Sequence, residues 1–362
     1  MFRASRMAKG QPARSAYRGK VFPRRAFVLG STALLGAAAA GCSHPKGITQ
    51  GGNVRLAMVT DTGGLGDRSF NDGAYHGLTE AKRLLHADIA VLQSRSAADY
   101  QPNLTVLANK EYDEIFAVGF LMARDVDEVA SRFPTRNFAI IDAVVDEPNV
   151  ASITFREQEG SFLAGAAAAM ASKTKTIAFI GGIDIPLLRK FETGYAAGAR
   201  QIDPSVTVLV KYVGSFDDPA AGKEIGSVLL SQNADVIYVA AGKAGLGAID
   251  AIKDKPGTYA IGVDVNQDAL VPGRILTSMV KRVDIGVLKI SREAATGKVP
   301  HGHIELGLKD GAIGLTDFHY TRNALTPAQF HELDVLRDAI IAGKISPPYT
   351  RDMLATFKPV KL

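Results

Sequence analysis

Short apolar runs alternate with amphipathic stretches from Val54 onward, and this alternation constrains the fold more than any other feature of the chain. The apolar runs lack a polar face, which is typical of strands buried on both sides. The stretches between them space their apolar residues at helical intervals, as Tyr75, Leu78 and Leu85 do. We expect strands at 54–59, 89–92, 115–118, 138–141, 150–155, 177–180, 206–212, 236–240, 259–263 and 276–280, and helices at 70–85, 100–109, 124–132, 161–170, 187–200, 220–232, 245–253, 283–295 and within 327–345.

This order of elements predicts an α/β fold with two Rossmann-like, doubly wound lobes. Parallel strands linked by helices form sheets that helices cover on both faces. The chain has 362 residues, which is too long for one ordinary domain and comfortable for two. Ligands of open parallel sheets bind beyond the carboxyl ends of the strands, so functional residues are expected there.

The first 41 residues differ from the rest in charge. They contain eight Lys and Arg residues and no acidic residue, so the remainder of a chain with net charge +5 carries −3. A basic surface for nucleic acid is therefore not supported. The apolar run at 26–41 would span about 24 Å as a helix, less than the ~30 Å of a bilayer core. Residues 1–41 are expected to be a signal peptide, with Sec and twin-arginine export both open because of Arg24-Arg25.

The only cysteine follows this run in Ala39-Ala40-Gly41-Cys42. Small residues before a cysteine resemble a bacterial lipobox, although Ala39 stands where leucine is usual. We expect Cys42 to be lipidated and residues 42–53 to form a tether; a buried free cysteine is the alternative. A single cysteine also excludes a disulfide scaffold and a cysteine-based zinc site.

Signals of enzyme chemistry are weak. Neither G-x-S-x-G nor H-E-x-x-H occurs, and Gly222-Lys223 lacks the spacing of a P-loop. His301 and His303 have no nearby partner ligands and are expected to be solvated. No metal and no cofactor are expected.

Polar, aromatic and glycine residues gather just after the expected strands, and these are the candidate ligand-binding residues. Ser69 is expected to cap the helix that follows the first strand. Phe191 is equally compatible with a position in the hydrophobic core and one in a ligand pocket, whereas Gly194 and Gly198 are expected to allow close packing of their helix against another. The candidates are Asp61, Phe70, Asn71, Asp142, Phe191, Phe216, Gly242, Asp264 and Lys281.

Asp264 and Lys281 end two successive strands and carry opposite charges. Two interpretations follow. They form a structural ion pair, or they jointly hold hydroxyl groups, since a carboxylate accepts and an ammonium donates hydrogen bonds to such groups. The second interpretation is preferred.

An ordered set of these motifs resembles the basic membrane protein family of bacterial lipoproteins, also called the PnrA-like or purine nucleoside receptor family. It comprises Thr60-Asp61, Ser69-Phe70-Asn71, Asp142, Tyr212-Val213-Gly214-Ser215-Phe216-x-Asp218, Ala241-Gly242, Gly262-Val263-Asp264 and Thr277-Ser278-x-x-Lys281. The resemblance covers about residues 54–315. One departure is Gly66-Asp67-Arg68, where relatives carry Asp-Asp-Lys; this loop is expected to be scaffold.

The resemblance implies a type I periplasmic-binding-protein fold with three hinge crossovers and the ligand in the cleft between the lobes. It implies an N-terminal lobe of 54–152 plus 281–305, a C-terminal lobe of 153–280 plus 306–330, and a helix and tail at 331–362.

The resemblance also implies function. The protein would be an extracytoplasmic, lipid-anchored receptor that passes a purine nucleoside to the permease and ATPase of an ABC importer. Phe70 would stack on the base, and Phe216 or Phe191 would cover its other face. Asp61, Asn71 or Asp142 would bond base nitrogens. Asp264 and Lys281 would hold ribose hydroxyls, with Gly242 near the sugar.

Three alternatives stay open. The same fold binds a sugar or another polyol, since aromatic rings and a hydroxyl-binding pair suit sugars too. A nucleoside hydrolase would need a metal or a general acid near the glycosidic bond. A sensory or adhesin-like surface role would involve no transport.

Overall fold

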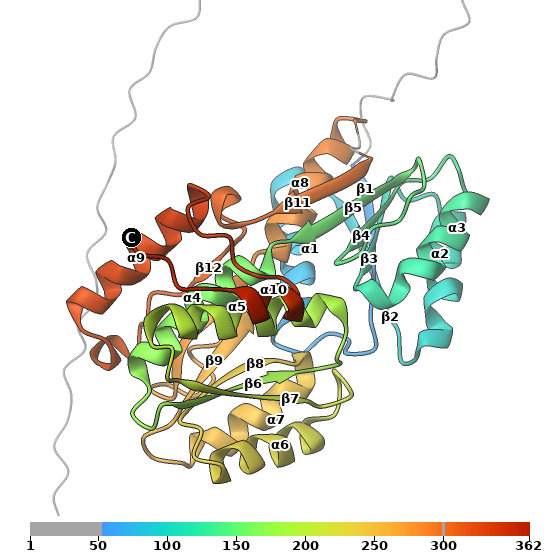
Figure 1. Cartoon of the computed structure of the whole chain (residues 1–362). Coiled ribbons are helices and arrows are strands. Elements are labelled where there is room, and N and C mark those ends of the chain that lie inside the picture. The colour runs from blue at the N-terminus through green and yellow to red at the C-terminus, as the bar shows by residue number, and fades with distance from the viewer. Residues whose placement is uncertain (1–52, 299–300) are drawn as a thin grey trace, which may run out of the picture. The chain divides into compact units, whose positions relative to one another are not determined.

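The computed structural model describes residues 53–298 and 301–362. Within these residues the strands form two six-stranded sheets. The first sheet has the order β11-β5-β4-β3-β1-β2 and the second β12-β10-β9-β8-β6-β7. Neighbouring strands are parallel except β10 and β12. The predicted α/β class is confirmed (Figure 1).

The strands have the following bounds. The first sheet contains β1 (Arg55–Thr60), β2 (Asp88–Gln93), β3 (Glu114–Val118), β4 (Phe138–Ile141), β5 (Val150–Phe155) and β11 (Gly302–Leu306). The second contains β6 (Thr176–Gly181), β7 (Thr207–Tyr212), β8 (Val236–Ala240), β9 (Tyr259–Asp264), β10 (Ile275–Lys281) and β12 (Ile313–Leu315).

Helices cover both faces of each sheet. On the first sheet α1 packs with α8, and α2 with α3; on the second α4 packs with α5, and α6 with α7. The helices are α1 (Phe70–Leu85), α2 (Tyr100–Asn109), α3 (Ala123–Arg132), α4 (Glu157–Ala171), α5 (Pro186–Ile202), α6 (Pro219–Ser231), α7 (Gly242–Lys253), α8 (Val283–Ala295), α9 (Pro327–Ile341) and α10 (Arg351–Thr356). Short 3-10 turns lie at η1 (Ala97–Asp99), η2 (Phe120–Met122), η3 (Leu308–Asp310) and η4 (Arg322–Ala324).

The chain passes between the sheets at three places. It leaves the first sheet after β5, returns to it through α8 after β10, and leaves it again between β11 and β12. We call each sheet with its helices a lobe. The lobe boundaries expected at 152 and 305 remain predictions; β5 continues to Phe155 and β11 to Leu306 in the first sheet.

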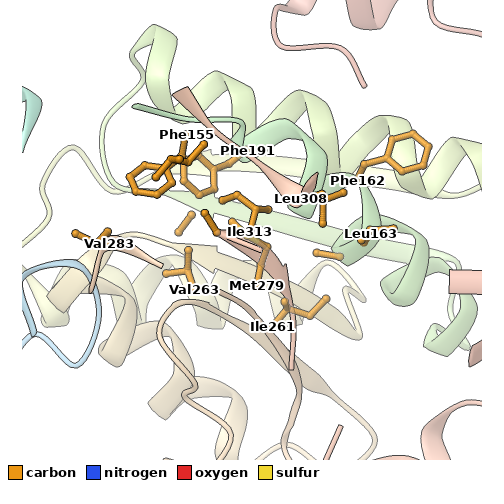
Figure 2. Close-up of a cluster of buried hydrophobic side chains, with 14 of the residues drawn as sticks. Phe155, Phe162, Leu163, Phe191, Ile261, Val263, Met279, Val283, Leu308 and Ile313 are labelled. Carbon is orange, nitrogen blue, oxygen red and sulfur yellow. The ribbon is translucent and has the colours of Figure 1, made fainter. Parts of the chain in front are cut away.

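One buried hydrophobic cluster joins the facing sides of the two sheets near these crossovers. Figure 2 shows Phe155 beside Phe191, with Val263, Met279 and Ile313 below them. Two further clusters fill the outer faces, one under α2 and α3 and one under α6 and α7.

The prediction that Gly194 and Gly198 serve close helix packing is confirmed. A Cβ on Gly198 would lie 1.8 Å from the carbonyl oxygen of Phe162, and one on Gly194 would lie 2.5 Å from that of Gln158. Both clashes involve the backbone of α4, so only glycine permits α5 to approach this closely.

Candidate ligand-binding site

All nine candidate residues line one cavity, with walls from both lobes. The cavity encloses about 560 Å³ of empty space, including the part open to solvent. The cavity lies at the carboxyl ends of β1, β4, β9 and β10, where ligands of parallel sheets bind. Which of these residues contact a ligand remains a prediction.

The loop between β1 and α1 is held by Asp67. Its Oδ1 accepts hydrogen bonds from the backbone N–H groups of Ser69 and Asp72, at 2.9 and 3.1 Å, and its Oδ2 accepts from Asn71 N at 2.8 Å. These bonds satisfy donors at the N-terminus of α1 that have no partner within the helix. The expectation that Ser69 caps this helix was wrong. Its side chain makes no capping hydrogen bond, because Asp67 fills that role.

Ser69 instead joins the two lobes. Its Oγ donates a 2.5 Å hydrogen bond to Oδ2 of Asp264 at the end of β9, and both side chains are buried. Beside it, Nε2 of Gln267 donates to the carbonyl oxygen of Arg68 at 2.8 Å. The loop at 66–68, expected to be scaffold only, therefore also contributes an interlobe contact, and Asp67 lines the cavity.

Asp61 lies at the end of β1, where burial raises the pKa of its carboxyl to about 6. Hydrogen bonds from Asn71 and Gly63 lower this pKa and the carboxylate of Asp67 raises it further, but burial is the largest effect. Oδ1 of Asp61 accepts both bonds, from Asn71 Nδ2 at 2.8 Å and from Gly63 N at 2.9 Å.

Lys281 is the centre of a buried charge cluster. Its Nζ donates to Asp142 Oδ2 at 2.6 Å and lies 3.8 Å from Glu157 Oε1 and 4.0 Å from Asp264 Oδ1. Burial lowers the pKa of Lys281, but the three carboxylates outweigh burial and raise it overall. Burial raises the pKa of Asp264 to about 6 and that of Glu157 to about 7, although Lys281 lowers both. The short ion pair therefore joins Lys281 to Asp142, and Asp264 is farther away.

Two of these aspartates have unusual backbone conformations. Asp142 has φ 69° and Asp264 has φ 64°, in the left-handed region that L-residues rarely adopt. They occupy matching places in the two lobes, after β4 and at the end of β9. Non-glycine residues held in this region cluster at functional sites, where surrounding contacts maintain the strain. Oδ1 of Asp142 is buried and lacks a hydrogen-bond partner among the described residues, which leaves an acceptor for a ligand.

Aromatic rings form the apolar walls of the cavity. Phe70 begins α1, and Lys281 Nζ lies 4.7 Å from its ring centroid. Phe191 lines the cavity and also belongs to the buried hydrophobic cluster, so it has both the core position and the pocket position that the sequence left open. Phe216 packs edge-on against Phe120 of the other lobe, with centroids 6.2 Å apart. A Cβ on Gly182 would lie 2.2 Å from Phe216 Cε1, so that glycine makes room for the ring.

Several lining residues were missed by the sequence analysis. Phe120 follows Gly119 directly after β3, which is the same glycine and aromatic signal that singled out Phe216. Leu187 and Leu188 carry no such signal, because apolar helix residues are usually core. The others are Gly63, Asp67, Ala240, Lys243 and Val263.

Within the described residues, no group of three or more His, Cys, Asp and Glu side chains could hold a metal ion. His301 and His303 are exposed, and Nε2 of His303 lies 2.6 Å from Thr154 Oγ1. No helix in the described part of the chain is long and apolar enough to cross a membrane. Cys42 and the expected leader and most of the tether lie outside the described residues.

Comparisons with known proteins identify the family. The sequence model of the PnrA-like ABC transporter substrate-binding protein family matches residues 54–351. The chain is 35% identical to the ABC transporter nucleoside-binding protein BmpA of Lactococcus lactis, over 91% of this chain and 99% of that protein. It is 37% identical to an uncharacterised lipoprotein of Pyrococcus horikoshii, over 78% of this chain and 75% of that protein. A crystal structure of an ABC transporter solute-binding protein from Aeropyrum pernix superposes with a TM-score of 0.78 at 29% identity, covering 84% of this chain and 96% of that one.

The family match covers most of the chain and agrees with the two-lobed fold and with the position of the cavity. Proteins of this family bind substrates outside the cytoplasm for an ABC transporter, whose permease and ATPase are therefore implied as partners. This chain belongs to the PnrA-like family of ABC transporter substrate-binding proteins.

Proposed function

We propose that this protein is a nucleoside receptor, with purine nucleosides as its ligands. The observation that carries the proposal is the composition of the cavity, which combines aromatic rings with buried, charged hydrogen-bonding groups. A flat base suits the aromatic faces, and ribose hydroxyls suit the charged groups. The nucleoside-binding name of the Lactococcus relative at 35% identity supports the same ligand class.

In this proposal the base stacks on Phe70, and Phe216 or Phe191 covers its other face. Asp61 and Asn71 contact the edge of the base. The ribose lies toward Lys281, where Asp264 accepts from its hydroxyls and Lys281 donates to its oxygens. Asp142 was expected among the base contacts, but its 2.6 Å bond to Lys281 favours a place at the sugar end.

Binding would work by closure of the two lobes, without breaking a bond. Because the cavity walls come from both lobes, a bound nucleoside contacts both and favours the closed arrangement. The closed receptor would then deliver its ligand to the permease from the membrane surface to which lipidated Cys42 anchors it.

A thermal-shift panel of the purified protein tests the proposal with adenosine, guanosine, inosine, cytidine, uridine, ribose and galactose. A ligand at 100 times its Kd stabilises a protein by about 2.7 kcal/mol, which raises the melting temperature clearly. Purine nucleosides should do so and free ribose should not. Stabilisation by sugars alone would overturn the nucleoside proposal.

Phe70→Ala removes the proposed stacking face and should abolish the nucleoside shift. Phe133→Ala is the matched control, because Phe133 packs at the outer face of the first lobe and does not line the cavity. It should lower the starting melting temperature and leave the ligand-induced shift unchanged.

A further inference from the structure

The amide of Asn71 has only one reasonable orientation. Its Nδ2 lies 2.8 Å from Asp61 Oδ1 and 3.0 Å from Asp67 Oδ2. An ionised carboxylate only accepts hydrogen bonds, so the donating nitrogen of the amide must face these two groups. Its Oδ1 is consequently directed elsewhere; it is buried and has no hydrogen-bond partner among the described residues. Asn71 therefore offers an acceptor at every pH.

Asp61 also keeps one oxygen for a ligand. Its hydrogen bonds from Gly63 and Asn71 both fall on Oδ1. Oδ2 lies 3.3 Å from the point that a Cβ on Gly119 would occupy, and Phe70 Cε1 lies 3.6 Å from the same point. Oδ2 of Asp61 and the Phe70 ring therefore border the same space beside Gly119. A base stacked on Phe70 would present its own edge to this oxygen.

The charged and titratable groups around Asp61 are mostly acidic. Asp67 from the loop before α1 and Asp217 after β7 both repel a charge on Asp61, and Tyr100 of α2 is also close enough to interact with it. Lys243 lines the cavity but is exposed, and Lys281 is already paired with Asp142. Burial with these acidic neighbours raises the pKa of Asp61 to about 6, so its carboxyl can gain a proton near neutral pH.

We propose that Asp61 recognises the base edge of a purine nucleoside in both of its protonation states. As a carboxylate, its Oδ2 accepts the N1–H of a 6-oxopurine nucleoside such as inosine or guanosine. As a carboxylic acid, Oδ2–H donates to N1 of a 6-aminopurine nucleoside such as adenosine, whose N1 is an acceptor. Adenosine binding then takes up a proton from solvent, and inosine binding does not. This inference rests on the proposed function.

Titration calorimetry with adenosine and inosine tests this at pH 7.5 and pH 6.0. The protonated fraction of a group with pKa 6 rises from about 3% to 50% between these pH values, so adenosine affinity should rise about 15-fold and inosine affinity should fall about twofold. Titrations at pH 7.5 in buffers with different ionisation enthalpies should show about one proton taken up with adenosine and none with inosine.

Asp61→Asn imitates the protonated state, because the amide can accept at Oδ1 and donate at Nδ2. This variant should bind adenosine with an affinity that no longer depends on pH, and it should bind inosine more weakly than the parent does. Asp217→Asn is the matched control. It changes the same functional group beside the cavity, at a position that does not line it. Adenosine binding should still depend on pH, with a midpoint at slightly lower pH because Asp217 no longer repels a charge on Asp61.

The outcomes separate this inference from the proposed function. If no nucleoside binds at either pH, the proposed function fails. If both nucleosides bind the parent protein with affinities independent of pH and without proton uptake, the proposed function stands and the role of Asp61 is refuted. Proton uptake is measured on the parent protein, so this test does not depend on Asp61→Asn folding normally.

Discussion

Replacing Lys281 with methionine tests the buried charge cluster most severely. Methionine has a similar length and no charge, so Lys281→Met removes the cation and leaves Asp142, Asp264 and Glu157 facing one another. The side chains of these carboxylates are at most 9% exposed. Little water therefore reaches these carboxylates to replace the lost ammonium.

Removing one partner of a buried ion pair lowers the free energy of unfolding by about 3–5 kcal/mol, because an uncompensated charge stays buried. A loss of 1 kcal/mol lowers the melting temperature of a large domain by about 2 °C, so Lys281→Met should melt about 6–10 °C below the parent protein at pH 7.5. The difference should shrink as the pH falls, because Asp264 and Glu157, with pKa values near 6 and 7 even beside Lys281, then take up protons.

Thermal unfolding followed by circular dichroism at pH 7.5 and pH 5.0 measures this effect. Lys289→Met is the matched control, because Lys289 forms an exposed pair with Glu293 on α8 and should change stability by less than about 1 kcal/mol. A Lys281→Met variant that melts within about 2 °C of the Lys289→Met variant at pH 7.5 would refute the reasoning.

Three further predictions concern packing, capping and pH. Gly198→Ala places a Cβ 1.8 Å from the carbonyl oxygen of Phe162, so α4 and α5 must separate; a loss of at least about 3 kcal/mol should appear in urea unfolding. Asp67→Ala removes the cap of α1 and should lower the free energy of unfolding by about 1–2 kcal/mol. Burial raises the pKa of Glu157 to about 7, so the folded state keeps a proton that the unfolded state releases near pH 4. The contribution of this carboxyl to the free energy of unfolding should therefore be fully present below pH 4 and be lost as the pH rises to 7.

Each of these predictions has its own check. Gly286→Ala places its Cβ 3.3 Å or more from its neighbours and should be tolerated; equal losses for Gly198→Ala and Gly286→Ala would contradict the packing argument. Thr79→Ala, also on α1, removes only an exposed hydrogen bond, so a loss as large as that of Asp67→Ala would contradict the capping role of Asp67. Glu157→Gln should flatten the fall in melting temperature between pH 4 and pH 7; an unchanged slope would exclude Glu157 as its source.

The sequence predicted the regular elements well where periodicity is strong. The helix at 70–85 has the expected bounds, because its apolar residues recur on one face and turn signals flank it. Helix α4 begins at Glu157, earlier than the expected Ser161, and Glu157 is buried there within reach of Lys190 and Lys281. An acidic residue at a helix start carries no sign of such burial. Strands β11 and β12 were missed because they are short, and their pairing partners are distant in sequence.

The sequence predicted which strand ends carry the site, but it did not predict which side chains form hydrogen bonds and ion pairs with one another. Topology alone brings the ends of β1, β4, β9 and β10 together, and that placed the candidate residues around one cavity. Which side chains bond to each other depends on distances that no pattern contains. Lys281 pairs closely with Asp142 of the other lobe, and Ser69 bonds to Asp264 instead of capping its own helix.

The most direct test of the account is a calorimetric titration of the purified protein with inosine and, separately, with free ribose. The account predicts saturable binding of one inosine per protein and no detectable binding of ribose at the same concentrations, since the base supplies the stacking contacts. Saturable binding of ribose with no binding of inosine would contradict the central claim and leave a sugar receptor of the same fold.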